Sequence, residues 1–153
     1  MDFEGALNIC ESSFPHPENS VLSTELSSSR TLPEEARISL IVKGSAQLAS
    51  GNCDVPLEYL LTVRNAMDQQ MVIIDWYWRI QVQSNLTEPW LAKGDLTQAR
   101  IEGERFLEVT LATAERTWQA LAWGTNARIA ILDADLDRAG DCIAKALSTM
   151  EGF

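Results

Sequence analysis

The chain has 153 residues, of which 46% are hydrophobic and 22% charged, a composition that fits one globular domain and excludes wholesale disorder. The formal net charge of −10 disfavours binding of this segment to nucleic acid or to an anionic membrane surface. No apolar run approaches the roughly 18 residues that span a bilayer, and the acidic start lacks the layout of a signal peptide, so the expected location is the cytoplasm.

Two segments precede the main helical part of the chain. Residues 2–13 show helical periodicity, whereas residues 14–33 hold three of the five prolines and a cluster of serines. We interpret 1–13 as the second helix of an incomplete repeat and 14–33 as a Ser/Pro-rich connector.

Helical periodicity then continues to the end, with almost no strand-like alternation. The pattern predicts helices over 34–50, from 54 to a break near 67–70, and over 71–92, 96–111, 113–132 and 135–150. Asp54 is expected to cap the second of these helices. Pro89 is expected to kink or break the third, with Thr87 as a new cap. The helical-repeat domain thus spans 34–153, with hairpins over roughly 34–69, 70–112 and 113–151.

A turn followed by a cap recurs along the chain. It is found at Met1-Asp2, Gly51-Asn52, Gly94-Asp95 and Ala134-Asp135, at intervals of 40 to 50 residues. A compact residue suits a tight turn, and a following Asp or Asn can cap the next helix. This recurrence predicts stacked helical hairpins, in which Ala99 and Ala139 are buried where helices approach closely.

The repeats resemble the tetratricopeptide consensus, W-x2-L-G-x2-Y followed by A-x3-F. In the last repeat the matching positions are Trp123, Asn126, Ala127 and Ala130, followed by Ala139 and Ile143. The phrases at 75–79, 90–96 and 113–123 resemble the C-terminal helical-repeat tails of large bacterial signalling and transcriptional regulators with a signal-transduction NTPase module. The resemblance implies a tetratricopeptide-like all-α superhelix of about three hairpins plus an orphan N-terminal helix, as a fragment of such a regulator.

Residue types suited to catalysis are scarce. The single histidine, His16, lies between two prolines in the connector, and no nucleotide-binding, hydrolase or zinc-protease motif occurs. The acidic run at 133–137 begins like a calcium-binding loop, but Arg138 and Ala144 stand where Gly and Glu are required. We therefore expect neither enzymatic activity nor a metal or cofactor.

The candidate binding residues lie on the first helices of the repeats, whose inner sides line the concave groove of tetratricopeptide proteins. They are Asp75, Trp78, Arg79, Arg116 and Arg128. An arginine in such a groove can clamp a peptide carboxylate, although solvation of the surface is the alternative role. The three consecutive aromatics at 76–78 point in three directions on a helix, so one or two of them must face solvent, a groove or a neighbour.

The expected function is a non-catalytic interaction or scaffolding module that binds a protein, a peptide or another domain of the parent chain. The alternative is a small-molecule-sensing domain that regulates an attached NTPase. A homodimer through exposed repeat ends is a further expectation. The apolar residues at these ends are Phe3, Ala6, Leu7 and Cys10 in the first helix, and Ile143, Ala146, Leu147 and Met150 in the last.

The repeat pattern makes a testable prediction at Ala139. A leucine at this position would overfill the contact between helices, so Ala139→Leu is expected to lower the free energy of unfolding by on the order of 1–3 kcal/mol. Urea denaturation of the two proteins measures the difference, and an unchanged midpoint would show that the repeat pattern is misaligned.

Overall fold

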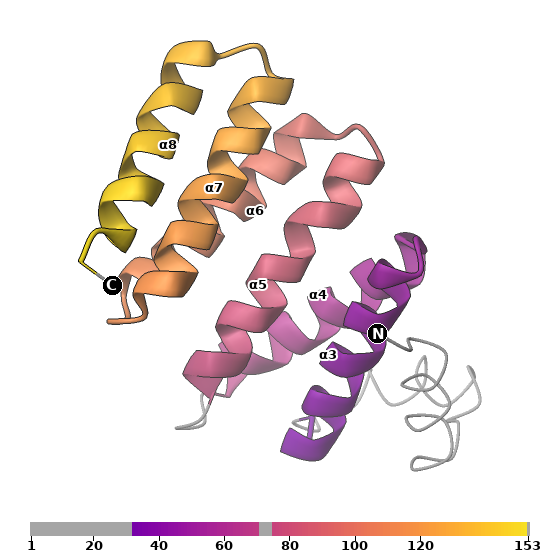
Figure 1. Cartoon of the computed structure of the whole chain (residues 1–153). Helices are drawn as coiled ribbons and strands as arrows, with labels where there is room; N and C mark the ends of the chain where they lie inside the picture. Colours follow the sequence, from indigo (N-terminus) through magenta and orange to yellow (C-terminus); the bar gives the residue numbers. More distant parts are fainter. Residues whose placement is uncertain (1–31, 71–74, 153) are drawn as a thin grey trace. The chain divides into compact units, whose positions relative to one another are not determined.

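The structure, a computed structural model, describes residues 32–70 and 75–152, and all regular structure within these ranges is helical (Figure 1). The helices are α3 (Glu34–Ala49), α4 (Asp54–Gln69), α5 (Asp75–Ala92), α6 (Leu96–Leu111), α7 (Arg116–Leu132) and α8 (Leu136–Met150). The predicted all-α class is therefore confirmed. The predicted helix over 1–13 and nearly all of the connector lie outside the described residues. The described helices belong to two compact units, α3–α4 and α5–α8.

The described part of the first unit is one helical hairpin. Its interior contains Ile41 of α3 together with Leu60 and Val63 of α4, all of which are buried. Gly44 allows the close approach of the two helices, because a Cβ at this position would lie 3.4 Å from Cγ of Leu60. The buried guanidinium of Arg37 donates a hydrogen bond to the carbonyl of Gln70, just beyond α4 (3.4 Å).

The second unit consists of two helical hairpins, α5–α6 and α7–α8. Helix α6 packs against both α5 and α7, and α8 packs against α7 (Figure 1). A shared core joins Ile80 of α5, Phe106 of α6 and Ala122 of α7. The ring of Trp118 meets that of Phe106 edge-on, with 6.4 Å between centroids, a favourable arrangement for two aromatic rings.

Small residues lie at the close contacts between helices. Ala99 and Ala139 are buried, which confirms the prediction made from the repeat pattern. Gly103 of α6 lies directly under α7, because a Cβ added to it would be 2.6 Å from Cδ1 of Ile129 and 3.2 Å from Oδ1 of Asn126. A side chain at position 103 would therefore require Ile129 and Asn126 of α7 to shift.

The turns within the three hairpins share one backbone geometry and lie at the predicted positions. Each contains a residue of positive φ: Gly51 (87°), Gly94 (73°) and Ala134 (60°). The N–H of the following residue bonds to a carbonyl in the last turn of the preceding helix: Asn52 to Gln47 (3.0 Å), Asp95 to Trp90 (3.0 Å) and Asp135 to Ala130 (2.9 Å). This pattern is a Schellman C-cap. Asp95 and Asp135 also cap the next helix, as their carboxylates accept from the N–H groups of Gln98 and Arg138.

The predicted break at Pro89 is wrong. Helix α5 continues through Pro89 to Ala92, and Thr87 is a buried residue inside the helix and not its cap. Proline removes one helical hydrogen bond and crowds the preceding turn. Here Leu86, Thr87 and Pro89 are all buried, so favourable packing of this stretch outweighs the local cost.

Two predicted helix starts also differ from the structure. Cys53 occupies the N-cap position of α4 without a side-chain cap bond, so the predicted capping role of Asp54 is wrong. Asp54 is instead the first helical residue, where the helix dipole favours its negative charge. Helix α7 begins at Arg116, three residues later than the periodicity indicated.

The close contact at Gly103 predicts opposite effects for two Gly→Ala substitutions. Gly103→Ala is expected to lower the free energy of unfolding by about 1 kcal/mol, because crowding against Ile129 exceeds the gain in helix propensity. Gly124→Ala, where nothing lies within 4 Å of the added Cβ, is expected to raise it by about 0.5–1 kcal/mol.

Urea denaturation of both variants measures these changes. Ile129→Val, which removes Cδ1, should cost less in the Gly103→Ala variant than in the unaltered chain, because it also relieves the crowding at position 103. A Gly103→Ala variant as stable as the Gly124→Ala variant would contradict the close contact.

Candidate interaction surfaces

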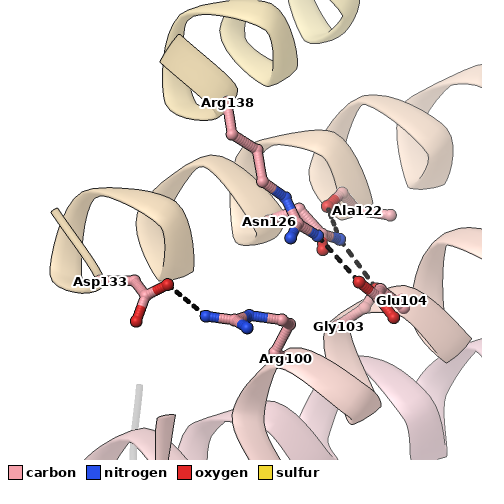
Figure 2. Close-up of polar contacts among 7 residues, drawn as sticks. All are labelled: Arg100, Gly103, Glu104, Ala122, Asn126, Asp133 and Arg138. Atoms are coloured by element: carbon pink, nitrogen blue, oxygen red, sulfur yellow. Dashed lines mark hydrogen bonds and ion pairs between the residues drawn. The ribbon is translucent and has the colours of Figure 1, made fainter. Parts of the chain in front are cut away.

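A buried side-chain amide joins α6 to α7 (Figure 2). Nδ2 of Asn126 donates to the carbonyl of Gly103 on α6 (2.8 Å) and to the carbonyl of Ala122 on its own helix (3.0 Å). An unpaired buried amide would cost about 1–3 kcal/mol, so shifting α7 along α6 is unfavourable. Asn126 therefore fixes the register of the two helices.

Two ion pairs extend this contact towards α8 (Figure 2). Arg100 of α6 pairs with Asp133 at the end of α7, and Arg138 of α8 pairs with Glu104 of α6 (2.9 Å). All four side chains are partly exposed, so each pair contributes only about 0–1 kcal/mol. They link α6 to the end of α7 and to α8 at the surface, and the packing of α7 against both helices sets their orientation.

A second set of residues forms a surface that α5 and α7 share. Nη2 of Arg128 on α7 pairs with Oε2 of Glu88 on α5 (2.6 Å), so these two side chains point towards each other. Residues separated by 7 or 11 positions lie on the same side of a helix. Tyr77 and Gln81 therefore lie on the side of α5 that carries Glu88, and Leu121 on the side of α7 that carries Arg128. We call these five residues the α5–α7 face.

The α5–α7 face combines exposed apolar groups with a charged pair. Helices α5 and α7 run in the same direction (Figure 1). Because Gln81 and Leu121 each lie 7 residues before a member of the ion pair, they are at the same level along the two helices. Tyr77 and Leu121 are both exposed, and Nε2 of Gln81 donates to the Tyr77 hydroxyl (3.3 Å). One end of the face is thus apolar and the other is ionic.

The structure separates the five predicted binding residues. Asp75 is buried, and Trp78 and Arg79 are half-buried near the start of α5. Arg116 binds the end of α8, where its Nε donates to the carbonyl of Thr149 (2.7 Å) and its Nη2 to that of Glu151 (2.6 Å). Arg128 alone of the five belongs to the α5–α7 face.

The aromatic run divides as expected, because Trp76 and Tyr77 are exposed and Trp78 is half-buried. The rings of Trp76 and Tyr77 meet edge-on, with 5.9 Å between centroids. Sequence reasoning missed Gln81, Glu88 and Leu121 as members of the face, and it placed Tyr77 in the aromatic run without naming it as a binding residue. The spacing of 7 residues from Arg128 indicates Leu121, but no sequence pattern shows that Glu88 is its ion partner.

A third surface is the outer side of α8. This helix buries Ala139 and Cys142 and exposes the apolar side chains of Leu136, Ile143, Leu147 and Met150. The predicted exposure of Ile143, Leu147 and Met150 is therefore confirmed, whereas Ala146 is half-buried. Leu136 and Leu147 retain 70% and 66% of their accessible surface, which is high for leucine side chains in a folded helix.

The comparisons with known proteins identify no relative: neither the family models, nor the curated proteins, nor the solved structures contain a match to this chain. Among the described residues, no cluster of three or more His, Cys, Asp or Glu side chains is placed to hold a metal ion. Likewise, no helix in the described ranges is both long and apolar enough to cross a membrane.

The different settings of Arg116 and Arg128 predict different effects of their removal. Arg116→Ala deprives the C-terminal carbonyls of α8 of two donors, so we expect a loss of about 1 kcal/mol and faster amide exchange in the last turn of α8. Arg128→Ala removes an exposed pair and should change the free energy of unfolding by less than about 0.5 kcal/mol. Hydrogen exchange and urea denaturation measure both effects. Equal stability losses in the two variants would contradict this assignment.

Proposed function

We propose that this chain is a non-catalytic helical-repeat module that binds a protein or peptide partner on the α5–α7 face. The observation that carries the proposal is the combination, on two packed helices, of the exposed Tyr77 and Leu121 with the Glu88–Arg128 pair. Tyrosine and arginine are among the residues that contribute most of the binding energy at protein interfaces, and the exposed leucine adds apolar surface beside them.

The ion pair supports a partner that brings a carboxylate. Both members are about half exposed, and an exposed ion pair contributes only about 0–1 kcal/mol. A carboxylate of the partner can therefore replace Glu88 on Arg128 at little cost in stability. Its guanidinium suits this role because it can bind a carboxylate through two parallel hydrogen bonds. An apolar side chain of the partner would then cover Leu121, which lies two helical turns before Arg128 on α7.

The sequence resemblance to tetratricopeptide repeats supports a second part of the proposal, that the module belongs to a larger cytoplasmic bacterial signalling or transcriptional regulator. The partner is then either a separate protein or another domain of the same regulator, and the fixed register of α6 and α7 keeps the face in one shape. A preformed surface loses less entropy on binding than a flexible one.

A pair of leucines with equal exposure tests the proposal. Leu121 and Leu111 each retain 51% of their surface, but only Leu121 belongs to the α5–α7 face. Peptides are selected from a random display library on the whole chain, and their affinities are measured by fluorescence anisotropy. Leu121→Lys should weaken binding at least tenfold, because it places a charge at the apolar end of the face, while Leu111→Lys should leave binding unchanged.

Two outcomes would contradict the proposal. In one, the selected peptides bind the Leu121→Lys variant as tightly as the unaltered chain. In the other, no peptide is selected and a small metabolite raises the melting temperature. A metabolite present at about 100 times its dissociation constant would add about 2.7 kcal/mol to the free energy of unfolding. The second result would favour the sensing function instead.

A further inference from the structure

The exposed side of α8 has the spacing of a helix-pairing surface. Leu136, Gly140, Ile143, Leu147 and Met150 are all exposed and follow one another at intervals of 4, 3, 4 and 3 residues. We call these five residues the α8 seam. Intervals that alternate between 3 and 4 place side chains in one stripe, and two such stripes pack by inserting side chains of one helix between those of the other.

The second unit already contains a covered version of the same stripe. The two turns at Gly94 and Ala134 have the same geometry, so residues of α6 and α8 that are 40 positions apart are equivalent. The equivalents of the α8 seam are Leu96, Arg100, Gly103, Leu107 and Thr110, and all of them are buried or half-buried.

Helix α7 is what covers this stripe on α6. Gly103 lies under Ile129, and the carbonyl of Thr110 accepts a hydrogen bond from Gln119 (3.4 Å). Leu107 packs against the core formed with Ala122. One repeat before α8, the same stripe on the second helix of a hairpin, α6, therefore packs against another helix, α7. The two helices run antiparallel (Figure 1).

We propose that the α8 seam binds the α8 seam of a second copy of this chain in an antiparallel pair. A twofold axis near the middle of α8 sets Leu136 level with Leu147 of the second copy, and Gly140 level with Ile143 of the second copy. A large residue then meets a small one where the helices cross, because a Cβ at Gly140 has nothing within 4 Å and leaves room for the isoleucine. Twofold pairing is also the commonest way in which one self-complementary surface is closed.

The antiparallel direction follows from the position of Gly140. In a parallel pair in register, Gly140 would lie beside Gly140 of the second copy, which leaves a void in the middle of the seam. The acidic residues beside the seam also remain separate in the antiparallel pair: Asp137 approaches Ala144 of the second copy and not another carboxylate. A single helix pair is a small interface, and the chain carries a net charge of −10, so we expect a dissociation constant on the order of micromolar.

Charge substitutions at the two leucines that meet in the pair test the proposal. Sedimentation equilibrium from ~1 to ~200 μM is expected to show a monomer–dimer equilibrium for the unaltered chain. Leu136→Glu and Leu147→Lys should each weaken dimerisation at least tenfold, because each buries a charge opposite a leucine. The double variant should recover most of the affinity, since Glu at 136 then meets Lys at 147 of the second copy. Leu111→Lys, on α6 at 51% exposure, is the matched control and should dimerise normally.

Two further measurements separate pairing from damage to the fold. The substituted leucines are 70% and 66% exposed, so circular dichroism should show melting temperatures within a few degrees of the unaltered chain. In about 0.5 M salt the dimer of the double variant should weaken through screening of its ion pairs, whereas that of the unaltered chain should not.

Three results would overturn the proposal. A monomer up to the highest concentration would leave the seam to a helix of a different protein or of another part of the parent regulator. A dimer unaffected by either single substitution would place the contact elsewhere. Two disruptive single substitutions without recovery in the double variant would exclude the antiparallel pairing. The α5–α7 face takes no part in this contact, so peptide binding and dimerisation can fail independently.

Discussion

The arrangement of α5 to α8 depends on the contact between α6 and α7 at Gly103. The missing side chain lets the two helices approach until Ile129 covers the glycine, and the amide of Asn126 then reaches its carbonyl at 2.8 Å. Steric fit sets the distance between the helices, and the hydrogen bond sets their register. Because α6 also packs against α5, the same contact determines how closely α5 and α7 approach, and therefore where Glu88 meets Arg128.

Local chemistry made much of the fold predictable from sequence. Two of the turns combine the residue of positive φ and the helix cap in neighbouring positions, Gly94-Asp95 and Ala134-Asp135. A pattern of two residues is therefore enough to predict where one helix ends and the next begins. Pro89 shows the limit of local reasoning. Its effect on α5 depends on how well the surrounding residues pack, and packing involves residues distant in sequence.

The candidate site was less predictable for the same reason. Arg128 was identified by its place on a first helix, but the identity of its partner depends on the relative positions of α5 and α7. Arg116 lies on the same helix and has a different role, since it binds carbonyls at the end of α8. Asp75 is buried, which its position at the start of a helix does not reveal. Periodicity indicates which residues share a side of one helix, whereas a surface built from two helices requires their packing.

The order of helix contacts in the second unit also has a kinetic consequence. Apart from a small contact between α5 and α7 and the Arg138–Glu104 ion pair between α8 and α6, each helix packs against the helix before or after it in the chain. Contacts between segments close in sequence require little loop closure, and proteins dominated by them fold within microseconds to milliseconds. Helix α8, which packs against α7 and reaches α6 only through the exposed Arg138–Glu104 pair, can detach without disturbing the core around Phe106. Opening of this unit should therefore begin at α8, and a second molecule bound along that helix would slow the first step of unfolding.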